Sequence, residues 1–555
     1  MSRLDFSIIA IYLAAIIFIG VIASMVRSRR AGSSQGSHYF LADGDLKWPV
    51  IGLAMFAANI STVQLVSLAQ SAYSYGLVYG NFEWMAGFTL VALSLFFAPV
   101  YLKAKVPTIP EFFERRYNRL CRDLLTVISL FSALVIHIGV ALFTAAYVLE
   151  GLLELPAGST ILGLSPTHFF IILLGVVTGI YTLTGGLRAV VWTESFQTIL
   201  LLAGAVTITI AGWHMVGGWH HLARTLQSSP HPLALKATHD GSFNPETGRF
   251  LSMMRPAGDP SKLPWYSVLL GYQVLAVWYW CTDQTIVQRV LAAKDARHAQ
   301  LGALFCAWLK ILPVFFFVLP GVICVALVQQ GAFGGASPEH PMNTYTFMVT
   351  HLLPSGFRGL VAAALIAAAM QTCSAALNSI ATLVAYDLVK SRKPGITDQN
   401  LVKIGRVTTA IATIVAIGLS PIFGHYSSII EGLNRLISYA APPITAVVLG
   451  GVFTRWATAR AAAATLIFGM CSGMALFLSD WFNLYKPDYM LATFFSCALC
   501  MAVLYVISRW KPETLSPLAE TCIWSKARGK GAPLIVLVSA AAVLCVFTVL
   551  YVYFW

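Results

Sequence analysis

Charged residues are scarce in this sequence. Asp, Glu, Lys and Arg make up 11% of its 555 residues, whereas hydrophobic residues make up 58%. A soluble domain usually carries about a quarter charged residues, and a chain this apolar cannot cover its folded surface with polar side chains. The scarcity excludes a soluble globular protein and predicts a polytopic protein whose solvent is lipid.

Catalytic and metal-binding patterns are also missing. The sequence has no HExxH zinc motif and no local pairing of a nucleophile with a base, which argues against an enzyme. The ten cysteines lie mostly in apolar runs, and the long polar stretch 217–264 has none. We interpret them as small packed hydrophobic residues without a disulfide framework or a metal site.

The net charge of +13 does not indicate a nucleic-acid partner. The basic residues recur in short clusters between apolar runs instead of forming one stripe. Apolar runs of roughly 20 residues are long enough to cross a bilayer, and about fourteen are present. They are 5–26, 48–72, 81–102, 124–149, 166–184, 190–216, 265–288, 299–328, 357–386, 404–424, 427–453, 457–478, 488–507 and 533–554.

Basic residues alternate between successive loops. The loops near 73–80, 150–165 and 425–426 contain no Lys or Arg. The odd-numbered loops hold most of the basic residues, among them Arg27, Arg29, Arg30, Lys47, Lys103, Lys105, Arg115, Arg116, Arg119, Arg122, Lys294, Arg297, Lys390, Arg392, Lys393, Lys403, Arg509, Lys511, Lys526, Arg528 and Lys530. Because Lys and Arg gather on the cytoplasmic side, we expect both termini outside the cell. The compact external loops favour a bacterial cytoplasmic membrane.

A charge within an apolar run is costly, and three such residues matter most here: Glu83, Glu194 and Lys310. A buried acid and a buried base can neutralise each other beside a cavity and together hydrogen-bond a neutral, hydroxyl-rich ligand. Other interpretations remain open. Glu83 could face lipid headgroups, Lys310 could form a structural ion pair, and Glu194 could serve only as a hydrogen-bonding group.

Polar patches interrupt three of the apolar runs. They read AANIST at 57–62, AVWYWCTDQ at 276–284 and MQTCS at 370–374. An unwound stretch inside a membrane frees backbone carbonyls that can bind a sodium ion, and aromatic rings can stack on sugar faces. Ordinary Ser/Thr contacts between helices are the alternative for the first patch, and aromatic residues at helical spacing more often serve packing. The middle of the run 124–149 offers only His137, which we interpret as a packing histidine.

Several longer segments, in this order and spacing, resemble the sodium/solute symporter family, and especially its sodium/glucose cotransporter branch. They are AANIS at 57–61, NFEWM at 81–85, PTIPEFFERRYN at 107–118, GGLRAVVWTESFQT at 185–198, WYWCTDQTIVQRVLAAKD at 278–295, LNSIAT at 377–382 and YAAPP at 439–443. The resemblance implies an all-α polytopic fold of the LeuT type, in which two inverted repeats of five helices carry flanking helices. The repeats would cover 48–216 and 265–454, with 1–47 ahead of them and 455–555 behind.

The resemblance also implies binding residues. Asn59, Gln64, Glu83 and Lys310 would hydrogen-bond a sugar, Tyr279 would stack on it as an inner gate, and Trp280 would lie beside Tyr279. Asn434 stands where the family pattern has a glutamine. Sodium would bind the carbonyls of Ala57, Ile60 and Ala368 and the hydroxyl of Thr372. Gln371 replaces a second hydroxyl and retains an amide oxygen. Around Glu194 the expected pair of serines is incomplete, so we predict one sodium per cycle.

The sequence therefore predicts a sodium-coupled symporter of a neutral monosaccharide resembling glucose or galactose, working by alternating access. Its predicted partners are the sugar, sodium and the lipid bilayer, without nucleic acid. Symport of another polyol or small organic solute, a proton-coupled or uncoupled carrier, and a membrane sugar sensor without net transport are the alternatives. The sequence predicts no particular oligomeric state.

Overall fold

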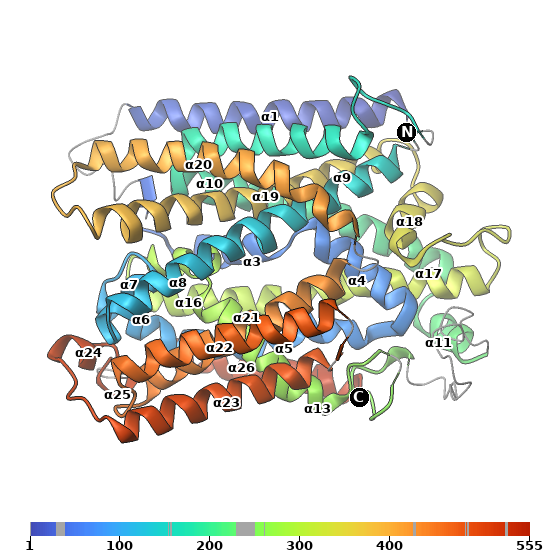
Figure 1. Ribbon diagram of the computed structural model, residues 1–555. Coiled ribbons are helices and arrows are strands. Elements are labelled where there is room, and N and C mark those ends of the chain that lie inside the picture. The colour runs from blue at the N-terminus through green and yellow to red at the C-terminus, as the bar shows by residue number, and fades with distance from the viewer. Residues whose placement is uncertain are drawn as a thin grey trace.

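The structure is a computed structural model that describes residues 2–28, 39–40, 42–153, 155, 158–228, 250–259, 261–425, 429–482, 484–485, 488–527 and 531–555. The basic residues expected at 29–30, 528 and 530, and the centre of the long polar stretch, lie outside these residues. The described chain is almost entirely helical, and its two termini lie at one end of the molecule (Figure 1).

Helices occupy every predicted span. In chain order they are α1 (Arg3–Ser28), α3 (Trp48–Asn59), α4 (Thr62–Tyr75), α5 (Asn81–Ala92), α6 (Ala98–Ala104), α8 (Arg119–Ser132), α9 (Val140–Leu152), α10 (Pro166–Val216), α13 (Trp265–Ser267), α14 (Gln273–Val277), α15 (Gln284–Leu291), α16 (Ala296–Leu309), α17 (Leu319–Gln329), α19 (Phe357–Leu383), α20 (Asp398–Leu419), α21 (Ile429–Phe453), α22 (Ala459–Trp481), α23 (Tyr489–Trp510) and α26 (Leu534–Tyr553). Shorter helices connect them: α7 (Ile109–Arg116), α11 (Trp219–Ser228), α18 (Thr344–Leu352), α24 (Pro517–Thr521) and α25 (Trp524–Ala527).

Among the described residues, eleven segments are long and apolar enough to cross a membrane. The three other expected spans are helical as well, but two of them are divided into shorter helices. The span 48–72 is divided between α3 and α4, and the span 265–288 is divided into short helices that end in α15. The first span, 5–26, is the helix α1.

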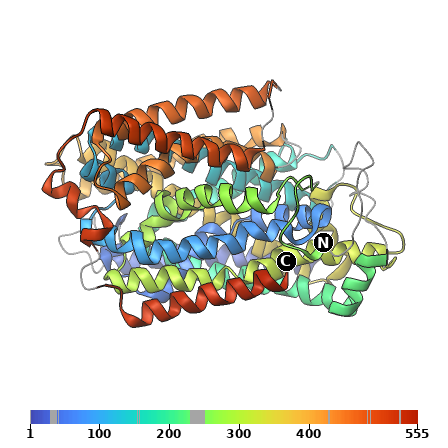
Figure 2. The same cartoon turned by 90° about the horizontal axis from the view of Figure 1, so that it is seen from below.

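The helices pack in two groups with a third between them. Helix α10 packs along α19, α1 and α20, whereas α21, α22 and α23 pack against one another. These groups lie on opposite sides of the molecule in Figure 1, with α3, α4 and α16 nearer the middle. In Figure 2, α26 runs along an outer edge, and it contacts α16 and α5.

The helix of the second span breaks after Asn59. Ile60 adopts an extended conformation and ends α3, and Ser61 begins α4 as a capping box: its hydroxyl accepts from Val63, and its amide donates to Gln64 Oε1 over 2.9 Å. The amide that would close the next turn onto the Ala57 carbonyl is thus used by a side chain. The break predicted from AANIST is present.

Two further breaks lie in the seventh and eighth spans. A π-helical turn at Trp278–Thr282 ends at Asp283, whose extended backbone and side chain begin α15. Helix α16 ends at Leu309, and the chain resumes with a π-helical turn at Val314–Val318. Pro313 precedes this turn and has no amide hydrogen to donate, which accounts for the break. The polar patch at 276–284 predicted the first of these breaks, whereas the second was not predicted from the sequence.

The fifth and sixth spans agree with the expectation of two membrane segments, Pro166–Leu183 and Thr193–Val216. Both lie within α10, whose helical geometry is interrupted at Gly186, where φ is +65° and ψ is −179°. Residues with a Cβ avoid this conformation, so one glycine suffices to redirect the helix. This interruption lies within the connection expected at 185–189 and separates the two spans.

All ten cysteines are free, and eight of them are buried. Cys497 and Cys500 have the C-x-x-C spacing, but they lie within the membrane helix α23. Their surroundings are apolar, as in a packed helix interface, since both belong to a hydrophobic cluster with Val274 and Ala446.

Helix α17 approaches α4 closely at Gly321, and a substitution there tests this packing. A Cβ at this position would overlap the carbonyl oxygen of Ala69. We expect Gly321→Ala to lower the stability of the purified protein by about 1–3 kcal/mol, as overpacking does. The measurement is thermal unfolding in detergent.

Gly418→Ala is the matched control, because a Cβ at this α20 glycine would meet no atom of a neighbouring element within 4 Å. That variant should unfold at or slightly above the wild-type temperature. Equal unfolding temperatures for Gly321→Ala and Gly418→Ala would contradict the packing described.

Candidate substrate and cation site

Lys310 lies where α16 ends, and its side chain is 1% exposed. Its ammonium donates to Asn59 Oδ1 over 2.5 Å and forms an ion pair with the Glu83 carboxylate. The ammonium also lies 5.4 Å from the centre of the Trp280 ring. These contacts join the ends of α3, α5 and α16 at one point.

Because Lys310 and Glu83 are buried, their charges must be neutralised inside the protein. An isolated charge in an apolar interior is costly, and a buried ion pair keeps its place only when further hydrogen bonds satisfy it. Lys310 and Glu83 neutralise each other, and Asn59 supplies the additional acceptor. Of the interpretations left open by the sequence, the structure has Glu83 paired inside the protein instead of facing headgroups.

A cavity of about 140 Å³ lies beside this cluster. A single water needs about 10–15 Å³ of such space, so the cavity holds the equivalent of about ten waters. The predicted sugar-binding residues on its wall are Asn59, Gln64, Glu83, Tyr279, Trp280 and Asn434. Lys310 is not on the wall; it lies behind Asn59 and Glu83 and contacts both.

Tyr279 is the aromatic centre of the wall. Its hydroxyl accepts from Asn59 Nδ2 over 3.2 Å, and its ring meets Trp280 edge-on with centroids 5.2 Å apart. Gln64 uses its Oε1 to accept from Ser61, so its Nε2 is the group that can donate to a ligand. Asn434 reaches the wall from α21.

His137 and Asp283 form a second buried pair at the cavity. His137 Nε2 lies 3.0 Å from Asp283 Oδ2, and the His137 ring is 5.9 Å from that of Tyr279. The sequence pattern indicated a packing role for His137 and no partner. The available signal was a lone titratable residue in the middle of one span and an aspartate at a helix break in another.

Three of the predicted sodium ligands, Ile60, Ala368 and Thr372, lie near one another between the α3 break and α19. The Thr372 hydroxyl lies 3.5 Å from the Ile60 carbonyl oxygen and 3.3 Å from that of Ala368. Thr62, which follows the break, donates to the Leu365 carbonyl over 2.9 Å. Carbonyls freed by a helix break and a neighbouring hydroxyl are oxygen donors of the kind that sodium sites use.

Gln371 points to a different neighbour. Its Nε2 lies 3.3 Å from the Glu194 carbonyl oxygen, and its Oε1 has no hydrogen-bond partner within the described part of the chain. The Glu194 carboxylate pairs with Arg289 over 2.6 Å, and both side chains are fully buried. Glu194 therefore has a cation of its own within the protein.

The family model for the sodium:solute symporter family matches residues 39–469. The chain belongs to this family. It is 32% identical to sodium/glucose cotransporter 2 of Rattus norvegicus over 86% of this chain and 72% of that protein. It is 31% identical to sodium/myo-inositol cotransporter 2 of Sus scrofa over 86% of this chain and 70% of that protein. The predicted resemblance is confirmed.

The fold of this symporter matches a solved structure of a Na+-coupled sialic acid symporter in a substrate-bound, outward-open state. The TM-score is 0.75 with 19% identity, and the match covers 93% of this chain and 99% of that one. The predicted LeuT-type helical fold is thereby confirmed. The residue bounds of the two inverted repeats stay a prediction.

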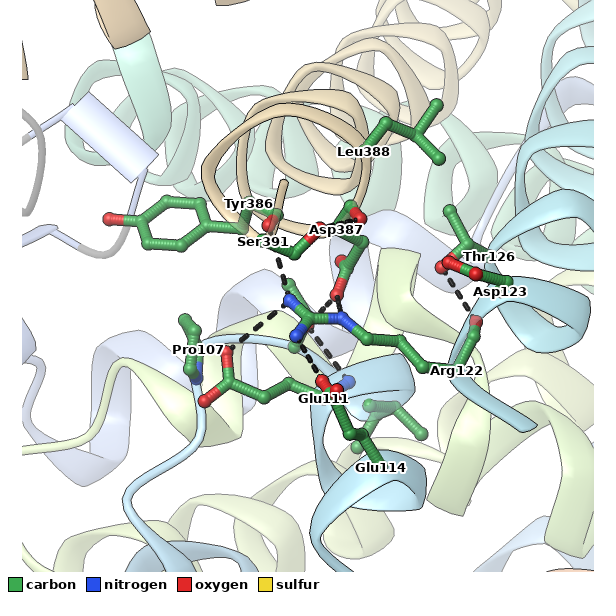
Figure 3. Close-up of polar contacts among 12 residues, drawn as sticks. Pro107, Glu111, Glu114, Arg122, Asp123, Thr126, Tyr386, Asp387, Leu388 and Ser391 are labelled. Carbon is green, nitrogen blue, oxygen red and sulfur yellow. Dashed lines mark hydrogen bonds and ion pairs between the residues drawn. The ribbon is translucent and has the colours of Figure 1, made fainter. Parts of the chain in front are cut away.

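The symporter has a further polar cluster at the end away from its termini, in the segment PTIPEFFERRYN and its surroundings (Figure 3). Arg122 of α8 donates to Asp387 Oδ1 over 2.7 Å and pairs with Glu114 of α7. Arg116 donates to three carbonyls after or at the end of α21, those of Gly451, Thr454 and Ala457. Helix α7 therefore fixes the ends of α19 and α21 to each other.

The Lys310–Glu83 pair can be tested by comparing the stability of a single variant with that of a double variant. Lys310→Met should destabilise the protein by about 3–5 kcal/mol, because it leaves the Glu83 carboxylate buried without a partner. Lys310→Met combined with Glu83→Gln should recover most of that loss. Thermal unfolding of the single and double variants measures the recovery, and additive losses would contradict the buried pair.

Proposed function

We propose that this sodium-coupled symporter carries a neutral monosaccharide resembling glucose or galactose. The observation that supports this proposal most strongly is the composition of the cavity beside the helix breaks. It combines amide and carboxylate groups that bind hydroxyls, from Asn59, Gln64, Glu83 and Asn434, with the rings of Tyr279 and Trp280. A sugar presents hydroxyls at its edge and C–H groups on its faces, which suits a few polar groups on an aromatic wall.

The charge of the cavity favours a neutral substrate over an acid. Glu83, the carboxylate on the wall, is balanced by Lys310 behind it. His137 on the wall is already engaged by Asp283 Oδ2, 3.0 Å from its Nε2. A carboxylated substrate would require a cation that is not already paired, whereas Lys310 is paired with Glu83.

Among neutral substrates, a hexose and an inositol both suit the polar and aromatic groups of the cavity. Relatives that align over 86% of this chain are named as cotransporters of glucose and of myo-inositol, and both compounds are neutral rings with several hydroxyls. Asn434 is one methylene shorter than the glutamine of the family pattern, and a displaced polar contact changes selectivity. We assign the hexose first and keep an inositol or another polyol as the second candidate.

Sodium would bind between the α3 break and α19, through the carbonyls of Ala57, Ile60 and Ala368 and the Thr372 hydroxyl. Thr372 also belongs to the cavity wall, so the ion would share a residue with the substrate site. Bound sodium would hold α3 against α19 in the outward-facing state, and its release inward would let them separate. Coupling requires the ion to bind one state better than the other.

The stoichiometry we propose is one sodium per cycle. Arg289 already neutralises Glu194, the carboxylate at which the resemblance would place another ion. One positive charge moving across the membrane gains about 2.3 kcal/mol per 100 mV, which is enough to concentrate a solute roughly 50-fold. The membrane potential alone can therefore drive accumulation with one ion.

Uptake into proteoliposomes tests the proposal. We expect labelled glucose or galactose to accumulate against its gradient when external sodium is present and the interior is negative. Replacing sodium by choline should abolish accumulation. Undiminished uptake in choline would favour a proton-coupled or uncoupled carrier, and saturable binding without accumulation would indicate a sensor.

Thr372→Val tests the ion site, because it removes one oxygen and keeps the side-chain shape. Losing one ligand should raise the sodium concentration for half-maximal uptake roughly tenfold. Thr409→Val is the control, since that hydroxyl makes an equivalent bond to a carbonyl of its own helix, Gly405, in α20. An equal effect of both substitutions on sodium activation would exclude Thr372 as a ligand.

A further inference from the structure

A second cavity, of about 940 Å³, lies apart from the substrate site. Its walls come from the turn Leu93–Phe97 with α6, from the start of α16, and from the segment that leads into α26. It shares no lining residue with the cavity beside Lys310. A space this large exceeds what a few waters need.

One part of this cavity is strongly basic. Lys103, Lys105, Lys294 and Arg297 line it. Among the described residues, Lys105, Lys294 and Arg297 form no ion pair. The carboxylate in the lining, Asp295, accepts from the His298 amide over 2.8 Å and begins α16. The cavity therefore has a clear excess of positive charge.

The other part of the cavity is apolar. Leu95, Phe96, Leu102 and Leu537 contribute to its wall. Trp524 closes this wall, with its ring 5.3 Å from that of Phe96 and its indole donating to the Leu95 carbonyl over 3.2 Å. Leu537 belongs to α26 and is 47% exposed, so the apolar wall continues onto a surface that faces lipid.

The position of this cavity agrees with its charge. Helices α6, α24 and α25 lie at the end of the molecule opposite the termini, beside α7 (Figure 1). The connections at this end carry the clusters of Lys and Arg, which gather on the cytoplasmic side of a membrane. The cytoplasmic leaflet holds anionic lipids, and basic pockets between membrane helices bind their headgroups.

We propose that this cavity binds an anionic phospholipid. The phosphate would lie among Lys105, Lys294 and Arg297, and an acyl chain would lie along Leu95, Leu102 and Leu537. A soluble phosphate compound shares the headgroup chemistry, but it would leave the apolar wall uncovered. The lipid would hold the start of α16 against α6 and α26, which are far apart in the sequence.

Lipid binding to the purified full-length protein in detergent tests this proposal. Phosphatidylglycerol should bind in preference to phosphatidylcholine with identical acyl chains, as measured by native mass spectrometry and by thermal unfolding. Near a membrane surface each Lys or Arg is worth about 1 kcal/mol, so removing two should weaken phosphatidylglycerol binding roughly 30-fold. The double variant Lys294→Gln with Arg297→Gln makes this change.

Matched variants separate the site from general charge. Lys393→Gln with Lys403→Gln removes the same charge from exposed positions outside the cavity and should change binding less than about twofold. Lys294→Arg with Arg297→Lys keeps the charge and should bind as the wild type does, which controls for folding. Equal losses in the two glutamine variants would overturn the proposal. Equal binding of the two lipids would overturn it as well, and so would glycerol 3-phosphate binding as tightly as phosphatidylglycerol.

Discussion

The architecture of the site depends on one buried ammonium group. Lys310 cannot reach water, so the protein must neutralise it where it lies. Glu83 and Asn59 do so from α5 and α3, which fixes three helices of different parts of the chain at one depth. The same arrangement leaves polar atoms of Asn59, Glu83 and Tyr279 on the wall of a cavity, with the Glu83 charge neutralised by Lys310.

Broken helices make this arrangement possible. A continuous helix would satisfy its own carbonyls and present only side chains to a ligand. The breaks after Asn59, at Asp283 and after Leu309 lie beside the cavity or beside Lys310, and side chains such as Ser61, Gln64 and Asp283 take up the amides that the breaks release. The carbonyls near Thr372 then remain available to an ion, next to the substrate cavity, so that ion and solute can influence each other.

Much of this could be read from the sequence, because a bilayer restricts what a chain can do. The scarcity of charge predicted the helical spans, and the cost of a charge in lipid singled out Glu83, Glu194 and Lys310. The family motifs added Asn59, Tyr279 and Thr372. Pairings between distant helices were not predictable, since nothing local joins His137 to Asp283 or Arg122 to Asp387. Nor did the sequence show that Lys310 lies behind the cavity wall, where it contacts Asn59 and Glu83.

The central claim is that sodium and sugar bind adjacent parts of one site and favour the same conformation. Calorimetric titration of the purified protein tests it most directly, with sugar titrated in sodium and in choline, and sodium titrated with and without sugar. Linkage requires the two ligands to raise each other's affinity by the same factor. We predict a factor well above one in both directions. Sugar affinity that is identical in sodium and in choline would contradict the account.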